Sequence, residues 1–476
     1  MSKEKTNKTN EAENAGLNIS VKSFLATILI IALLMVGTYA LTFIIPGGSY
    51  TRILDVNGNS IIDVSGEFIN VEGGIPFWKW ILSPFLVIGT DGGGLLIAII
   101  AFLLVIGGVF TGLEESGMMK YMLDKIVNRF GKMKYRLLCM LTFFFMAMGA
   151  LIGSFEECIP LVPVVVSLAI KLGWDSMTGL GMSLLAVGCG FASGVFNPFT
   201  VGVAQNLAGL TMFSGAGYRA VSFALIYALL VVFLLRHAKR IDAKHEGELQ
   251  IDEFTANQKM DKSLVFFGSV VGVGILIVLS SAFITVLQDY TMIIIALMFL
   301  VAGVGSTLLA GVGGKKLVSS FGKGVVNIFP AVLLILMASS IKYTLTEGKI
   351  LDTILHEAVG MMENLPQWSI IIFIYLIVLV MNFFISSGSA KAFLLIPLII
   401  PMAQIFGIEP QLCVMAFAFG DGFSNVFYPT NAALLIGLGL AKEGYGKWVK
   451  FSWKFQAINL LLTSILLLIG YYIGYN

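Results

Sequence analysis

Two adjacent glutamates, Glu156 and Glu157, interrupt a long apolar part of the chain. The runs on either side, residues 137–152 and 159–170, contain no charged residue. Each run is shorter than the roughly 20 apolar residues that a helix needs to cross a bilayer. A bent pair of half-helices with the two acids at its tip therefore fits better than one spanning helix. Ionisable groups at membrane depth are costly and by default mark a functional site.

The composition of the whole chain agrees with a membrane location. Of its 476 residues, 57% are hydrophobic and 12% are charged, and the mean hydropathy is +0.91. These values indicate an all-α polytopic membrane protein. The net charge of +2 gives no reason to expect a nucleic-acid partner. The four cysteines show no metal-ligand spacing, and the three histidines lie in polar connections, so we predict no metal site and no cofactor beyond a coupling ion such as sodium or a proton.

The order of apolar and polar segments divides the chain into two similar halves. A second bent pair is predicted over residues 368–407, with its tip at Ser386–Lys391. Each half also has a span that breaks at a proline, at Pro198 and at Pro429, because proline cannot continue a helix cleanly. The predicted units are a cytoplasmic tail (1–22), a first transmembrane repeat (23–236), a cytoplasmic linker (237–262), a connecting span (263–288) and a second transmembrane repeat (289–476).

Glycines, prolines and aromatic residues recur in the two halves at offsets of 231 to 234 positions. Examples are Pro163 with Pro397 and Pro198 with Pro429. The distribution of lysine and arginine places the N-terminus and every strongly basic loop in the cytoplasm. This orientation gives about nine full spans plus two re-entrant hairpins that enter from opposite sides. An inverted-topology repeat with two broken helices is typical of secondary transporters.

Polar residues gather at the two tips and the two breaks, which we expect to meet near the middle of the membrane. Irregular backbone at that depth is tolerated where it lines a cavity or is buried in protein, and free amides at half-helix N-termini favour an anionic group. Asn197 and Asn431 could instead act as helix caps, and the serine-rich second tip as flexible loop. The predicted substrate-binding residues are Ser154, Glu156, Glu157, Asn197, Thr200, Ser387, Gly388, Ser389, Lys391, Thr430 and Asn431.

The charged residues of this set offer more specific chemistry. Glu156 and Glu157 could bind a substrate ammonium, carry a coupling proton or help to ligate sodium. Lys391 occupies the position equivalent to Glu157 in the other half and could bind a carboxylate or neutralise a glutamate across the cavity. A buried ion pair is the structural alternative, because unpaired charges are costly there. The predicted ion-coupling residues are Glu156, Asp421 and Asn425.

The segments Gly-Val-Phe-Asn-Pro-Phe-Thr at 194–200 and Phe-Tyr-Pro-Thr-Asn at 427–431 resemble those of the C4-dicarboxylate anaerobic carrier-like family of bacterial permeases. Ile-Ile-Pro-Gly-Gly-Ser-Tyr-Thr-Arg at 44–52 is similar to its branch of basic amino acid antiporters. The resemblance covers nearly the whole chain after residue 22. It implies membership of the broader ion-transporter superfamily, with substrate and sodium at the hairpin tips and a homodimeric assembly.

Together these features predict a secondary active transporter that works by alternating access in the bacterial cell membrane, as a multi-pass protein with a cytoplasmic N-terminus. Its expected partners are a small amino acid or carboxylate solute and the lipid bilayer. Acids at one tip and a lysine at the other suit a zwitterion, and Asp421 favours a cationic one, as in arginine/ornithine antiport. The alternative is a C4-dicarboxylate carrier coupled to sodium or protons, and antiport and symport both stay open. A channel would lack paired hairpins, and an enzyme would need a nucleophile with a base, so neither class fits.

Overall fold

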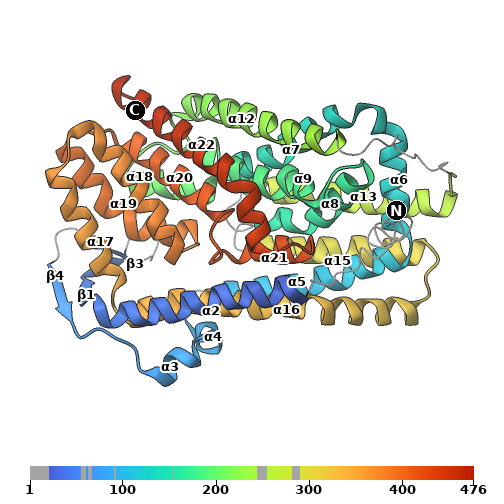
Figure 1. Ribbon diagram of the computed structural model, residues 1–476, viewed down its shortest axis with the longest axis horizontal. Coiled ribbons are helices and arrows are strands. Elements are labelled where there is room, and N and C mark those ends of the chain that lie inside the picture. The colour runs from blue at the N-terminus through green and yellow to red at the C-terminus, as the bar shows by residue number, and fades with distance from the viewer. Residues whose placement is uncertain are drawn as a thin grey trace.

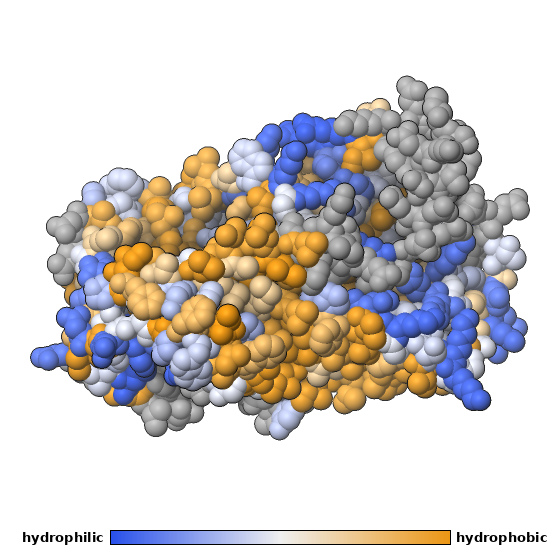
Figure 2. Space-filling model, turned by 60° about the horizontal axis from the view of Figure 1, so that its bottom comes forward, coloured by the Kyte–Doolittle hydropathy of each residue, from blue (hydrophilic) through white to orange (hydrophobic). Residues whose placement is uncertain are grey.

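The computed structural model of the protein describes residues 21–54, 60–62, 67–90, 93–153, 155–243, 255–280 and 290–476. The described chain is mostly helical, and ten of its helices or joined helices are long and apolar enough to cross a membrane. An apolar band runs across the middle of the face shown in Figure 2, with hydrophilic residues gathered towards the two ends. The predicted all-α polytopic class is confirmed.

Three long helices form one layer of the molecule: α2 (Val21–Ile44), α5 (Gly93–Glu115) and α16 (Gly314–Glu347) (Figure 1). The close approach of α5 to α16 depends on glycine, because a Cβ on Gly324 would lie 2.1 Å from the carbonyl oxygen of Gly107. Small residues at such crossings allow helix backbones to pack closely in membranes. Next to this layer lie α13 (Gln258–Ser280) and α15 (Thr291–Leu309), which contact each other.

The two broken spans form the centre of the protein. The first comprises α9 (Ser176–Leu180), a π-helical segment (Gly181–Leu185), α10 (Ala186–Ser193), a second π-helical segment (Pro198–Gly202) and α11 (Val203–Leu207). The second comprises α20 (Pro410–Asn425) and α21 (Ala432–Leu440). All of α10 is buried, as is α20 after its first residue, so the polar side chains of α20, among them Asp421 and Asn425, lie inside the protein. Both predicted breaks are confirmed.

The helices α10 and α20 cross with almost no side chain between them. A Cβ on Gly422 would lie only 2.3 Å from the backbone nitrogen and Cα of Ala192. The crossing therefore brings one broken helix of each half into direct backbone contact.

Each predicted bent pair is present as two helices with a short connection, while the re-entrant course of the pairs stays a prediction. The first comprises α7 (Lys134–Ile152), a 3₁₀ segment (Glu156–Leu161) and α8 (Val162–Lys171), and Gly153 ends α7 with a φ of 73° that favours glycine. The second comprises α18 (Gln367–Phe384) and α19 (Gly388–Ile405). The second half of each pair packs against the resumed half of the opposite broken span, α8 against α21 and α19 against α11.

One end of the molecule holds short strands packed on a helix of the second half (Figure 1). The polar segment after the first span also predicts short strands at residues 51–53 and 60–64, on either side of an Asn57-Gly58 turn. In the structure β2 (Arg52–Leu54) and β3 (Ser60–Ile62) pair antiparallel, while the turn lies outside the described residues. A second pair, β1 (Gly47–Tyr50) with β4 (Phe68–Val71), was not predicted. The strand β1 packs against α17 (Leu351–Gly360), and the Arg52 guanidinium pairs with Asp352 at 2.9 Å. Short helices near this end are α3 (Phe77–Ile81), α4 (Ser83–Leu86) and the 3₁₀ segments Val87–Gly89 and Met361–Asn364.

The basic segments lie near the other end, around α6 (Met118–Phe130) and the 3₁₀ segment Gly131–Met133. Lys125 pairs with Asp261 at the start of α13, and Lys134 pairs with Asp242 at the end of α12 (Ala216–Asp242). The last helix, α22 (Tyr445–Tyr472), packs against α12. The helix α12 continues beyond residue 236, the predicted end of the first repeat, and contains His237, which the sequence analysis placed in a polar connection. The segments expected on one side of the membrane thus lie together, while the inverted repeat itself stays a prediction.

Candidate functional site

The hairpin tips and the helix breaks meet at the centre of the protein. A Cβ on Gly153, at the first tip, would lie 2.2 Å from Oδ1 of Asn197 at the first break. A Cβ on Gly388, at the second tip, would lie 2.6 Å from Oδ2 of Asp421 and 2.7 Å from the methyl carbon of Thr200. Glycine at these two positions therefore lets the tips approach side chains of the broken spans.

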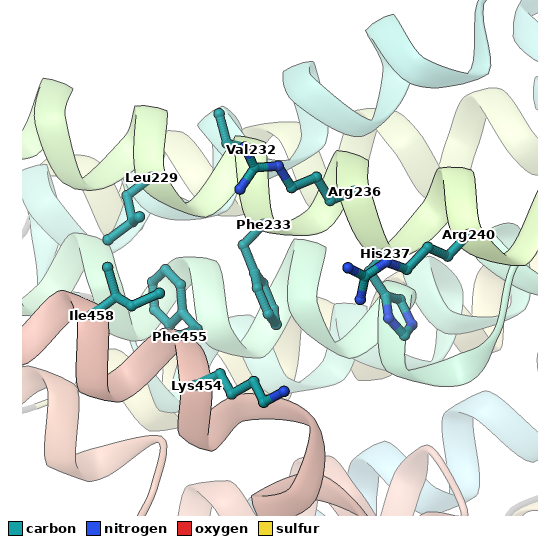
Figure 3. A pocket seen from close by; sticks show the side chains of 9 residues that line it. All are labelled: Leu229, Val232, Phe233, Arg236, His237, Arg240, Lys454, Phe455 and Ile458. Carbon is teal, nitrogen blue, oxygen red and sulfur yellow. The ribbon is translucent and has the colours of Figure 1, made fainter.

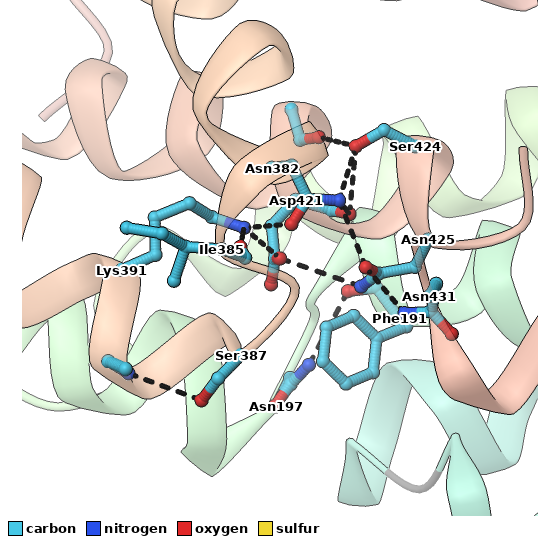
Figure 4. Close-up of polar contacts among 12 residues, drawn as sticks. Phe191, Asn197, Asn382, Ile385, Ser387, Lys391, Asp421, Ser424, Asn425 and Asn431 are labelled. Carbon is cyan, nitrogen blue, oxygen red and sulfur yellow. Dashed lines mark hydrogen bonds and ion pairs between the residues drawn. The ribbon is translucent and has the colours of Figure 1, made fainter. Parts of the chain in front are cut away.

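The main polar feature at this junction is an ion pair between Lys391 and Asp421 (Figure 4). The ammonium nitrogen lies 2.6 Å from Oδ1 of Asp421, and both side chains are 0% exposed. Lys391 also donates to the side-chain oxygen of Asn382 and to the carbonyl of Ile385. The sequence leaves three roles open for Lys391: binding a carboxylate, neutralising a glutamate of the first tip, or forming a buried ion pair. In the structure Lys391 lies in the first turn of α19 and forms a buried ion pair with an aspartate of its own half.

Asn382 links the ion pair to the rest of the second half. Its amide nitrogen donates to Oγ of Ser424 at 2.6 Å, to Oδ1 of Asn425 at 2.9 Å and to the backbone carbonyl of Asp421 at 3.2 Å. Asn382 and Ser424 were not among the predicted residues. Asn382 could have been identified from the sequence, since it is the only amide side chain in the apolar run that leads to the second tip.

Three predicted residues cap the half-helices that start at the junction. Oδ1 of Asn197 accepts hydrogen bonds from the amides of Phe199 and Thr200 at 3.0 and 3.2 Å. Asn431 accepts from the amide of Leu434, and Ser387 from that of Ala390. The amide nitrogen of Asn431 is also used, since it donates to Oδ1 of Asn425 at 3.0 Å. These side chains thus fix the start of the half-helices.

Several acceptors at the junction have no hydrogen-bond partner among the described residues. They are Oδ2 of Asp421, Oγ1 of Thr200 and Oγ1 of Thr430, all of them buried. Buried polar atoms are nearly always paired in native proteins, so this concentration at one place is what a ligand site requires. Asp421 Oδ2 and Thr200 both face the space that the missing side chain of Gly388 leaves open.

The first tip contributes a carboxyl group to the same place. Glu156 is half-buried and lies close enough to Asp421 for the two carboxylates to interact. Ser389 is half-buried in the first turn of α19. Ser154 and the side chain of Glu157 lie outside the described part of the structure. Within that part, no group of three histidine, cysteine or carboxylate ligands is arranged to hold a metal ion.

Residues 24–472 match the model of the DcuC family, the C4-dicarboxylate anaerobic carriers. The chain belongs to this family. It is also similar to the "Putative basic amino acid antiporter YfcC" of Escherichia coli K12, with 28% identity over 409 residues that cover 80% of this chain and 79% of the relative. A protein of uncharacterized function from Haemophilus influenzae is 22% identical over 390 residues, which cover 78% and 75% of the two chains. These matches and the apolar helices make the protein a multi-pass membrane transporter.

Two solved transporter structures align with almost the whole chain. The YdaH transporter of Alcanivorax borkumensis aligns over 95% of this chain and 98% of its own, with a TM-score of 0.44 and 16% identity. MtrF of Neisseria gonorrhoeae, which belongs to a class of antimetabolite efflux pumps, aligns over 98% and 97%, with a TM-score of 0.42 and 14% identity.

Proposed function

We propose that the protein is a secondary active transporter that exchanges basic amino acids, such as arginine and ornithine, by alternating access. The observation that supports this most directly is the unpaired oxygen of a buried carboxylate, Asp421 Oδ2, at the point where the tips and the helix breaks meet. A carboxylate buried away from water is stable only when its oxygens are satisfied. An ammonium or guanidinium group of a substrate would satisfy this one.

The charge balance of the junction favours a cationic solute over a dianion. Glu156 and Asp421 are acidic, and Lys391 is the only base among the described residues of the junction. Because Lys391 already donates to Asp421, Asn382 and Ile385, it has little capacity left for a substrate carboxylate. A basic amino acid could place one cationic group at Asp421 and a second at Glu156.

The substrate carboxylate would bind to backbone amides. Three of the half-helices that begin at the junction are capped, by Asn197, Ser387 and Asn431 respectively. The N-terminus of a helix attracts an anion through its dipole and through those first amides that the capping side chain leaves unpaired. The hydroxyls of Thr200 and Thr430 lie at the two breaks and could add donors, so one site would bind both ends of a zwitterion.

The second candidate function is transport of a C4-dicarboxylate with sodium or protons, in line with the description of the family. It would require protonation of Asp421, which would release the ammonium of Lys391 to bind a carboxylate. Sodium could instead bind oxygen atoms at the breaks, such as those of Asp421 and Asn425, which the sequence analysis assigned to ion coupling.

A counterflow assay in proteoliposomes distinguishes these functions. Vesicles loaded with unlabelled arginine, ornithine or succinate would be tested for uptake of each labelled solute, with and without sodium and at two pH values. We expect arginine and ornithine to exchange without added sodium. Uptake of succinate without either amino acid would contradict the proposal and favour the second function.

Single substitutions test whether transport depends on the residues of the junction. We expect Asp421→Asn and Glu156→Gln each to reduce exchange at least tenfold, because each removes a carboxylate that would bind a substrate cation. Lys391→Gln should also abolish exchange or change its selectivity. The matched control is Glu347→Gln, which removes a carboxylate that pairs with Lys79 at 3.0 Å outside the junction. Equal exchange by the junction variants and the control would show that substrate binds elsewhere.

A further inference from the structure

A cleft on the surface of the helical bundle lies between α12 and α22, and none of the residues that line it belongs to the tips or the breaks (Figure 3). Its volume is about 230 Å³. The two helices run antiparallel along it, so the C-terminal part of α12 faces the N-terminal part of α22. We propose that this cleft binds an anionic phospholipid of the surrounding membrane, with the acyl chain along its apolar part and the phosphate at its basic end.

The apolar part of the cleft extends over more than one helical turn. On α12 it is lined by Leu229, Val232 and Phe233, which lie three and four positions apart and therefore share one face of the helix. On α22 it is lined by Phe455, which is buried, and by Ile458, which is 53% exposed. The rings of Phe233 and Phe455 pack with centroids 5.4 Å apart and form the floor. An acyl chain lying there would cover apolar side chains without displacing any contact between the helices.

Three cationic side chains line the other end of the cleft. Arg236 and Arg240 follow Val232 on the same face of α12, and Lys454 stands on α22 (Figure 3). All three are exposed, and none has a carboxylate within ion-pair distance in the described ranges of the chain. His237 also lines this end, but its ring is already bound to Asp175 at 3.1 Å. The basic end thus offers a single anionic group three cations that pair with no carboxylate of the described residues; Lys454 also lies over the ring of Trp453, 5.6 Å from its centroid.

The combination of these two parts selects a lipid rather than a soluble anion. A free phosphate would use the cations and leave the apolar part empty, and a neutral lipid would use the apolar part alone. The position also fits, because both helix ends are predicted to lie at the cytoplasmic face, where the membrane surface attracts basic segments. Trp453, next to Lys454, is 49% exposed, as expected for an aromatic residue at the membrane interface.

Native mass spectrometry of the purified protein tests the proposal. Phosphatidylglycerol is titrated into detergent micelles that contain the full-length protein, and phosphatidylcholine and inorganic phosphate are titrated in parallel. We expect one molecule of phosphatidylglycerol to bind at low concentration and no comparable binding of the other two. The triple variant Arg236→Gln, Arg240→Gln, Lys454→Gln should bind it about a hundredfold more weakly, since each basic residue near a membrane contributes roughly a factor of five.

A matched control removes the same charge from a different surface. Lys120, Arg129 and Lys132 are exposed, and none forms an ion pair within the described residues. The triple glutamine variant of these residues should bind phosphatidylglycerol as the unmodified protein does. A further variant, Val232→Trp, fills the apolar part while keeping all three cations, and it should weaken the binding of phosphatidylglycerol at least tenfold.

Four results of the binding experiments would overturn the proposal. They are unchanged binding in the cleft variants, an equal loss in the control, equally tight binding of phosphatidylcholine, and binding of inorganic phosphate without the lipid. The proposal would also be wrong if the purified protein formed a dimer without bound lipid and the Val232→Trp substitution dissociated that dimer. A second copy of the chain would then cover the cleft.

Discussion

Removal of the ammonium at the centre of the protein should destabilise the fold strongly. In Lys391→Met, the carboxylate of Asp421 loses its cation, and the acceptors on Asn382 and Ile385 lose a donor. Loss of one partner of a fully buried ion pair costs about 3–5 kcal/mol, because the other charge stays in a medium that cannot solvate it. The change should appear as a lower free energy of unfolding, measured by denaturant titration in mixed micelles.

Two further variants separate this effect from a general loss of packing. Lys391→Met combined with Asp421→Leu removes both charges, and buried pairs replaced by apolar residues of similar volume are often neutral. The double variant should therefore recover most of the lost stability while lacking transport. Lys79→Met is the control, since its pair with Glu347 is about one-third exposed and should contribute less than about 1 kcal/mol. A Lys391→Met protein as stable as this control, or a double variant no more stable than the single one, would refute the reasoning.

Three other substitutions test separate features of the fold by thermal unfolding in detergent. Gly422→Val should destabilise the protein by about 1–3 kcal/mol or more, since its side chain would enter the backbone of Ala192; an unchanged melting temperature would mean that the crossing is looser. Asn431→Ala should cost about 1 kcal/mol through loss of a helix cap, and Asn431→Ser, which keeps a capping oxygen and likewise lacks the amide donor to Asn425, is its control. Asp175→Ala should cost a similar amount. Burial tends to raise the pKa of Asp175, but hydrogen bonds from His237 and Thr178 outweigh it and hold the pKa below its ordinary value. The stabilisation by this carboxylate is therefore complete at neutral pH and is lost as the pH falls through that lowered pKa, so the difference from the unmodified protein should shrink in acid.

The sequence predicted the helices, both breaks and both tips, because each depends on local chemistry. Apolar runs of fixed length predict spans, and Pro198 and Pro429 end helices wherever they stand. The strands β2 and β3 were also predicted from their own residues and a turn signal. The pair β1 with β4 was missed, because its partners are about twenty positions apart and one strand contains Gly47 and Gly48, which are not typical of strands.

The partner of Lys391 could not be predicted in the same way. Alignment of the two tips gives a glutamate of the other half as one candidate partner of this lysine. In the structure, Lys391 belongs to the first turn of α19, and the packing of α19 on α20 directs its side chain towards Asp421. The direction of a side chain depends on the helix that holds it and on the neighbour that it meets. Spacing along the chain does not contain that information.

The contact between β1 and α17 has a consequence for biosynthesis. Arg52 and Asp352 are separated by 300 residues, and the backbone amide of Gly48 donates to the carbonyl of Lys349. At a translation rate of about 5–20 residues per second, the ribosome needs roughly 15–60 s to reach Asp352 after Arg52. During that interval the strand segment has none of these partners. This end of the protein is therefore completed only after the whole first half and the beginning of the second half have been synthesised.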